Sequence, residues 1–199
     1  MLFRSHAVGI TTTPRETHES FFLASLACDR LDQLAASSEV PFHLRVDFWG
    51  PHQPHFPTRE YAAMYDPEDI PEYGNFRVDF STKPEYYRHD PNKPISNEDG
   101  LLIQPNPLNW GEWQHIIARA FAHITMIDDA AGMILNKLEE LGLAENTLVM
   151  WTGDHGDALA SHGGHFDKGS YMTEEVIRVP LAIRWPGHIE PGQVRDEFV

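Results

Sequence analysis

Apolar residues recur at helical spacing in two long stretches of the chain. The first runs from Glu19 to Ala36, and the second runs from Asn109 to Gly142. In the second stretch Asn109 is followed by Glu112 in the manner of a capping box, and Gly142 suits the position just beyond a helix. The spacing predicts a helix in each stretch. The apolar positions are Phe22, Leu23, Leu26, Leu31 and Leu34 in the first, and Trp113, Ile116, Ile117, Ala120, Phe121, Ile124, Ile127, Ala131, Ile134, Leu135, Leu138 and Leu141 in the second.

Three shorter apolar runs predict β-strands. Residues 41–50 are rich in aromatic and β-branched side chains with partial alternation, whereas 148–151 and 179–185 lie on either side of a polar loop. The long helix, a short link and the strand at 148–151 make an αβ unit, so we expect an α/β fold with a mostly parallel sheet flanked by helices.

Residues 58–109 are the least regular part of the chain. A short helix is plausible from Thr58 to Met64, but prolines interrupt every later candidate element. We expect a long ordered loop that wraps the core or lines the entrance to a site, not a separate second domain. Residues 1–199 are therefore interpreted as one partial domain.

Composition restricts the classes of partner. The chain has 199 residues, 41% of them hydrophobic, and 30 acidic residues against 15 Lys and Arg give a formal charge of -15. This charge argues against a nucleic-acid or anionic-membrane surface. No apolar run approaches the roughly 20 residues of a membrane-spanning helix. No signal peptide is seen, which slightly favours a cytoplasmic location. A single cysteine, Cys28, excludes an intrachain disulfide framework.

Candidate chemistry follows the strand predicted at 148–151. Asp154 and His155 lie between Gly153 and Gly156, which let the backbone turn so that both side chains can face one ion. A carboxylate and an imidazole are good ligands for a divalent first-row metal. The alternative is that Asp154 caps the following turn and His155 bonds to the backbone. An isolated lysine such as Lys168 is more often a solvated surface charge.

Several motifs occur in order along the chain, and together they resemble the sulfatase family of the alkaline-phosphatase-like superfamily, which includes phosphonate monoester hydrolases. The resemblance covers nearly the whole chain. It implies a sulfuric ester hydrolase that cleaves a small anionic ester with a divalent metal. The motifs are Phe48-Trp49-Gly50-Pro51-His52-Gln53-Pro54, Thr152-Gly153-Asp154-His155-Gly156-Asp157, Ser161-His162-Gly163, Asp167-Lys168-Gly169, Glu174-Glu175, Arg178-Val179-Pro180-Leu181 and Arg184-Trp185-Pro186-Gly187.

The resemblance assigns roles to individual residues. Asp154 and His155 would be metal ligands, and His52 and Lys168 would contact the ester oxygens and stabilise charge on the leaving group. His162 would lie near the site. The metal is expected to be manganese or calcium, with manganese ahead because imidazole is a ligand that a hard, all-oxygen calcium site lacks.

The chain also departs from the family pattern. Sulfatases carry a Cys/Ser-x-Pro-x-Arg motif whose first residue becomes the formylglycine nucleophile. Cys28 lacks this motif, because it is followed by Asp29-Arg30-Leu31. The acidic pair of metal ligands that the family has near its N-terminus is absent too. We therefore expect a chain incomplete at both ends and inactive alone. The alternatives are a phosphonate or phosphate ester hydrolase, a non-catalytic metal-binding remnant, or a subunit completed by another chain.

Five further residues are interpreted as structural. Glu174, Glu175 and Arg178 are spaced closely enough on a helical turn for acid and Arg to pair with each other. His55 and His165 have no firm counterpart in the family, so a structural or solvent-facing role is expected for both.

Overall fold

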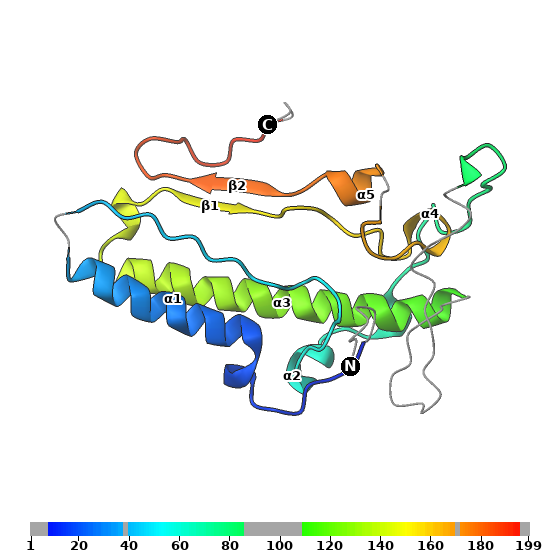
Figure 1. Cartoon of the computed structure of the whole chain (residues 1–199), viewed down its shortest axis with the longest axis horizontal. Coiled ribbons are helices and arrows are strands. Elements are labelled where there is room, and N and C mark those ends of the chain that lie inside the picture. Colours follow the sequence, from blue (N-terminus) through cyan, green and yellow to red (C-terminus); the bar gives the residue numbers. More distant parts are fainter. Residues whose placement is uncertain (1–7, 38–39, 86–108, 170–171, 196–199) are drawn as a thin grey trace.

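A computed structural model describes residues 8–37, 40–85, 109–169 and 172–195 (Figure 1). Two helices are long, and all the other helices and strands are short. The helices are α1 Glu19–Ala35, α2 Arg59–Ala62, α3 Trp110–Glu140, α4 Ser161–Gly164 and α5 Glu174–Ile177, the strands are β1 Val149–Thr152 and β2 Leu181–Arg184, and 3-10 turns occupy Arg15–Thr17, Pro67–Asp69 and Ala144–Asn146.

Both long helices lie where the hydrophobic spacing predicts them. At the start of α3 the Asn109 side-chain oxygen accepts a hydrogen bond from the Glu112 backbone N–H at 3.1 Å, which satisfies a donor that the helix leaves unpaired. Gly142 follows the helix with a φ of +67°, a conformation that favours glycine. At the start of α1, His18 acts as the cap, since its Nδ1 accepts from the Ser20 N–H at 3.3 Å.

The two long helices run side by side in the same direction and form one layer (Figure 1). Their contact includes one cluster around Phe21 and Met126 and another around Leu31 and Leu138. The short helix α2 is attached to this layer by Tyr61, whose hydroxyl donates a 2.5 Å hydrogen bond to a carboxylate oxygen of α3. The short helix expected at Thr58 to Met64 is therefore confirmed.

The strands β1 and β2 lie above the helices and pair antiparallel, with Val149 opposite Arg184 and Thr152 opposite Leu181 (Figure 1). They confirm the strands expected at 148–151 and 179–185. The mostly parallel sheet is not confirmed, because the described residues contain only this antiparallel pair.

The prediction of a β-strand at 41–50 is wrong, because this segment pairs with no other strand among the described residues. The segment is extended and its residues alternate between exposed and half-buried, with Phe42 and Leu44 packed against the cluster around Leu31. Alternation of exposed and half-buried residues suits an extended backbone, but a strand also needs a neighbour for its hydrogen bonds. Among the residues described here, no segment forms backbone hydrogen bonds with 41–50.

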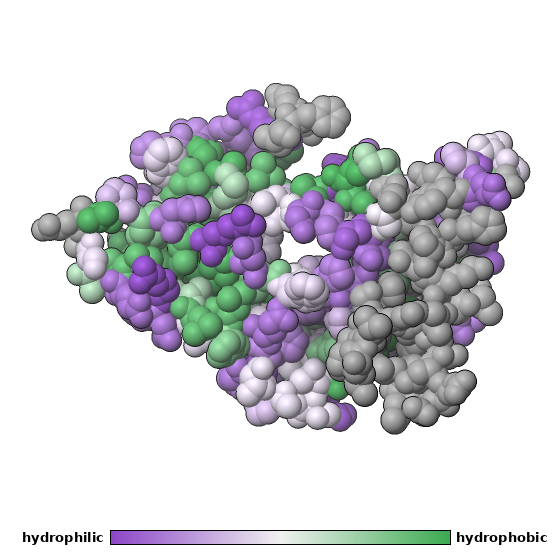
Figure 2. All heavy atoms as spheres, in the orientation of Figure 1, coloured by the Kyte–Doolittle hydropathy of each residue, from purple (hydrophilic) through white to green (hydrophobic). Residues whose placement is uncertain are grey.

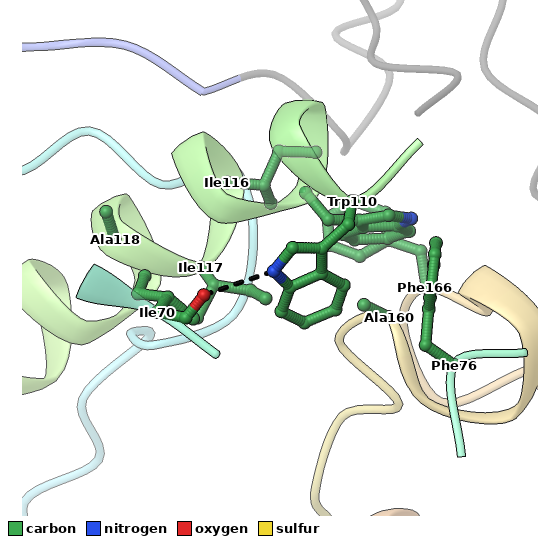
Figure 3. Close-up of a cluster of buried hydrophobic side chains, with 9 residues drawn as sticks. Ile70, Phe76, Trp110, Ile116, Ile117, Ala118, Ala160 and Phe166 are labelled. Carbon is green, nitrogen blue, oxygen red and sulfur yellow. Dashed lines mark hydrogen bonds between the residues drawn. The ribbon is translucent and has the colours of Figure 1, made fainter. Parts of the chain in front are cut away.

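The N-terminal end of α3 anchors two irregular segments at once. The Ile70 carbonyl accepts hydrogen bonds from Trp110 Nε1 at 3.1 Å and from Gln114 Nε2 at 2.7 Å. Ala160 and Phe166, from the loop after β1, pack in the same buried cluster (Figure 3). The prediction that 58–109 is mostly irregular holds for residues 63–85, which contain only one 3-10 turn. Residues 86–108 lie outside the described residues.

Within the described residues, no helix combines the length and the apolar character needed to cross a bilayer. The hydrophobic residues visible in Figure 2 gather over the half of the molecule that holds α1 and the β1–β2 pair. Two apolar residues of these elements are well exposed, Met150 of β1 at 57% and Phe22 of α1 at 58%.

Candidate active site

The loop after β1 holds the predicted metal ligands. Asp154 and His155 follow the strand end, and the Asp154 Oδ1 accepts from the His155 backbone N–H at 3.0 Å. The two side chains converge, since His155 Nε2 lies 3.7 Å from Asp154 Oδ2. Gly156 permits this turn, because a β-carbon there would collide with the backbone carbonyl of Glu175.

The side chains of Asp154 and His155 could supply two of the ligands of a divalent ion. His155 Nδ1 lies 2.8 Å from the Gly156 carbonyl oxygen, which only accepts, so Nδ1 carries the hydrogen and Nε2 keeps its lone pair for a metal. Two ligand atoms 3.7 Å apart are both within reach of one ion at metal–ligand distances of about 2.0–2.6 Å. No set of three or more His, Cys, Asp or Glu side chains gathers for a metal in the described ranges. The pair therefore fits part of a coordination sphere.

The predicted ester-binding pair is also formed. Lys168 Nζ lies 2.8 Å from His52 Nε2, although the two residues are 116 positions apart in the sequence. His52 Nδ1 lies 2.6 Å from the Gln53 carbonyl oxygen, so it donates, and Nε2 of the neutral ring accepts from the ammonium. The Lys168 side chain is 37% exposed, and its ammonium contacts another polar side chain as well as solvent.

The structure brings the two pairs together. The rings of His52 and His155 are 6.1 Å apart between centroids in an edge-on arrangement. Trp49 also lies next to His52, with ring centroids 5.2 Å apart. A carboxylate, two imidazoles and an ammonium thus face one region at the end of β1.

His162 is not part of this group in the described contacts. Its Nε2 lies 2.9 Å from Glu175 Oε2, and the other Glu175 oxygen accepts from Asn75 Nδ2 at 2.8 Å. His162 adopts a left-handed backbone, with φ +50°, which turns its side chain toward α5. The interaction links the loop after β1 to α5 and to the irregular segment 63–85.

Sequence reasoning assigned no role to two acidic residues of the same loop, Asp157 and Asp167. Burial raises the pKa of Asp157, although hydrogen bonds from the Leu159 and Asp167 backbone N–H groups oppose this. For Asp167 burial would also raise the pKa, but the Lys168 N–H, the Gln53 side chain and the Lys168 charge lower it below its usual range. The signal was present in the motifs themselves, since Asp157 directly follows Gly156 in Gly153-Asp154-His155-Gly156-Asp157 and Asp167 directly precedes Lys168 in Asp167-Lys168-Gly169.

The residues interpreted as structural are either buried or paired on the surface. His55 and His165 are 2% and 3% exposed. Arg178 and Glu174 approach to 3.9 Å on the surface of α5. Cys28 lies within α1 with its Sγ 3.7 Å from a carbonyl oxygen of α3, and burial raises the pKa of its thiol.

Comparisons with known proteins agree with the motifs. The sulfatase family model matches residues 19–199. An arylsulfatase of Clostridium perfringens is 32% identical over 80% of this chain and 31% of its own length, and the multifunctional alkaline phosphatase superfamily protein PehA of Trinickia caryophylli is 30% identical over 93% of this chain and 36% of its own length.

Solved structures give the same result for the fold. The phosphonate monoester hydrolase of Agrobacterium radiobacter superposes with a TM-score of 0.72 at 23% identity, over 88% of this chain and 34% of its own chain. This chain spans about a third of the length of the relatives it matches. Because the family model covers most of the chain and the site motifs occur in the family's order, the chain belongs to the sulfatase family.

Proposed function

We propose that this chain forms part of a hydrolase that cleaves sulfate esters with the help of a divalent metal ion. The observation that carries the proposal is the Lys168–His52 contact of 2.8 Å beside the Asp154–His155 pair. An ammonium and a metal ion placed on one side of an anionic ester would neutralise its charge and stabilise the charge that develops on the leaving oxygen. A chain with a formal charge of -15 needs such local cations to attract an anion.

Asp154 and His155 would hold the metal ion. When bound, it would act as a Lewis acid on the ester oxygens. The Nδ1–H tautomer of His155 leaves Nε2 free for this role, and the Asp154 side chain is 91% exposed and accessible to an ion. The other ligands would come from groups outside the described residues. We expect manganese to bind more tightly than calcium, because an imidazole nitrogen suits a first-row ion better. Binding of calcium alone, measured by calorimetric titration of the chain, would reject that order.

Lys168 and His52 would act on the ester itself. Since His52 donates through Nδ1 to the Gln53 carbonyl, its Nε2 accepts from Lys168. The proton nearest the ester is therefore on the ammonium of Lys168. His52 would orient that ammonium, and it would donate a proton to a departing oxygen only when its own Nε2 is protonated.

A phosphonate or phosphate ester is the second candidate substrate. It is supported by the 30% identity to PehA, which is named a multifunctional member of the alkaline phosphatase superfamily. Both substrates present anionic oxygens to the same cations, so the site geometry does not separate them. Affinities of the chain for 4-nitrophenyl sulfate and for a phenylphosphonate monoester would decide between them, with tighter sulfate binding expected.

The accompanying proposal for the fold is a mostly parallel sheet around β1, which segment 41–50, extended but unpaired among the described residues, would join only with a further strand beside it. Both run in the same direction above the helices (Figure 1), and Phe48 and Trp151 bring their rings within 6.2 Å. The unpaired backbone of 41–50 suits a neighbouring strand from a segment that is not among the described residues, or from a complementing chain. The formylglycine nucleophile would have to come from sequence outside these 199 residues, since no Cys or Ser among them begins the required motif.

The test of the function is anion binding and turnover by the chain. Inorganic sulfate should bind in the presence of manganese, and Lys168→Ala should abolish this binding, while Lys83→Ala, which removes an exposed lysine, should not. We expect no turnover of aryl sulfates by the chain alone. If sulfate binds equally to wild type and Lys168→Ala, the non-catalytic alternative is favoured. Metal-dependent turnover that is lost in Lys168→Ala would overturn the expectation of inactivity.

A further inference from the structure

Asp157 lies at the beginning of the loop that ends at Lys168. Its Oδ1 accepts two hydrogen bonds, from the backbone N–H of Leu159 at 2.8 Å and from the backbone N–H of Asp167 at 3.0 Å. One carboxylate oxygen therefore joins the start of the loop to its end. Because Asp167 directly precedes Lys168, this oxygen fixes the backbone from which the Lys168 side chain extends.

The loop needs such a connection because its backbone conformation is unfavourable. Four residues other than glycine have positive φ angles: Leu159 at 35°, Ala160 at 81°, His162 at 50° and Asp167 at 65°. Residues with a β-carbon rarely adopt this region, at a cost of roughly 1–2 kcal/mol each. Such conformations persist only where surrounding contacts enforce them.

The connection continues from Asp167 to the ester-binding pair. The Asp167 Oδ1 accepts from the Lys168 backbone N–H at 2.7 Å and lies 3.5 Å from Lys168 Nζ. Lys168 Nζ then contacts His52 Nε2 at 2.8 Å. A sequence of short contacts thus runs from Asp157 through the backbone of Asp167 to the ammonium and the imidazole.

We propose that Asp157 is a positioning residue that holds Lys168 against His52. The inference rests on the proposed function of that pair. Both partners of Asp157 are backbone N–H groups, so the acceptor oxygen does the positioning and the negative charge is not required. Asn keeps a side-chain oxygen at the same reach, whereas Ala removes it and Ser is too short to span both N–H groups.

The loop has a second attachment that should keep such variants folded. Ala160 and Phe166 are buried against the N-terminal part of α3, with the Trp113 and Phe166 rings 5.5 Å apart (Figure 3). Loss of the Asp157 carboxylate leaves this apolar contact intact. We therefore expect Asp157→Ala to release the end of the loop, where Lys168 lies, without unfolding the chain.

The experiment is NMR of the chain alone, which requires no turnover. A nuclear Overhauser contact between the Lys168 ε-methylene and the His52 ring reports the positioning, and titration with inorganic sulfate reports binding. Wild type and Asp157→Asn should show the contact and similar affinity. Asp157→Ala should lose the contact and bind sulfate at least about tenfold more weakly, because displacements of about 1 Å at a site have large effects. Circular dichroism melting verifies the fold, and Asp157→Ser replaces the Ala variant if that variant does not fold.

The outcomes separate this inference from the proposed function. Retention of the contact and of sulfate affinity in a folded Asp157→Ala would overturn the inference. Loss of the contact in Asp157→Asn would also overturn it, since the acceptor oxygen is still present. If the contact responds as expected but wild type does not bind sulfate, Asp157 positions Lys168 and the proposed function fails.

Discussion

Two buried imidazoles should make the chain sensitive to acid. His55 and His123 are 2% and 5% exposed, and their rings lie 6.1 Å apart, edge-on. Burial, followed by the charges of His123 and His52, lowers the pKa of His55 from 6.5 to about 3. Burial, followed by the charge of His18, lowers the pKa of His123 from 6.5 to about 4. Both rings are therefore mostly neutral in the folded chain at pH 5 and above.

The sign and size of the effect follow from proton linkage. The unfolded state binds protons below pH 6.5 and the folded state does not, so stability is complete above pH 6.5 and is lost as the pH falls toward the folded pKa values. At pH 5 each histidine is about 1.5 pH units below its unfolded pKa, which corresponds to about 2 kcal/mol. Together His55 and His123 should lower the free energy of unfolding by about 4 kcal/mol between pH 8 and pH 5.

The assay is urea denaturation followed by circular dichroism at pH 8 and pH 5. The difference between the two free energies of unfolding should fall by about 2 kcal/mol in His55→Leu and by a similar amount in His123→Leu. His43→Gln, which changes an exposed histidine, is the matched control and should leave the difference unchanged. If both Leu variants keep the full pH dependence of wild type, the buried neutral imidazoles are not its source and the reasoning is refuted.

Three further changes test local features of the fold. Asn109→Ala removes the α3 cap and should cost about 1 kcal/mol of stability in thermal melts, whereas Asn109→Ser should cost less. Tyr61→Phe removes the donor to α3 and should cost about 2 kcal/mol in urea denaturation; no change would mean that the bond is not formed in solution. Gly156→Ala meets the Glu175 carbonyl and should weaken manganese binding, while Gly74→Ala, in open space, should not; equal binding by both would contradict the packing.

The local features of this chain were readable from its sequence. The apolar stripes and the Asn109 cap predicted both long helices because helical spacing depends only on neighbouring residues. The strands around the polar loop were predicted for the same reason. The strand at 41–50 failed because the alternation predicts an extended backbone and does not show whether another strand lies beside it. The antiparallel pairing of β1 with β2 likewise depends on where the chain returns, which no local pattern records.

In the candidate site, too, some features could be predicted from the sequence and others could not. By itself the sequence determined which residues are the candidates for the chemistry, because Asp154, His155, His52 and Lys168 occur in motifs that resemble a family. Only the tertiary structure decided which of them meet. It joined His52 to Lys168 across 116 positions, and it turned His162 away to Glu175.

The role proposed for Asp157 likewise rests on the tertiary structure. In the sequence it is one more acid beside a glycine, whereas in the fold its carboxylate oxygen joins two backbone N–H groups of one loop. The physical reason is that residue type fixes which atoms can donate, accept or bind a metal, while distance and burial decide whether they do. Those two quantities arise only when the helix layer, the strand end and the irregular loops pack together.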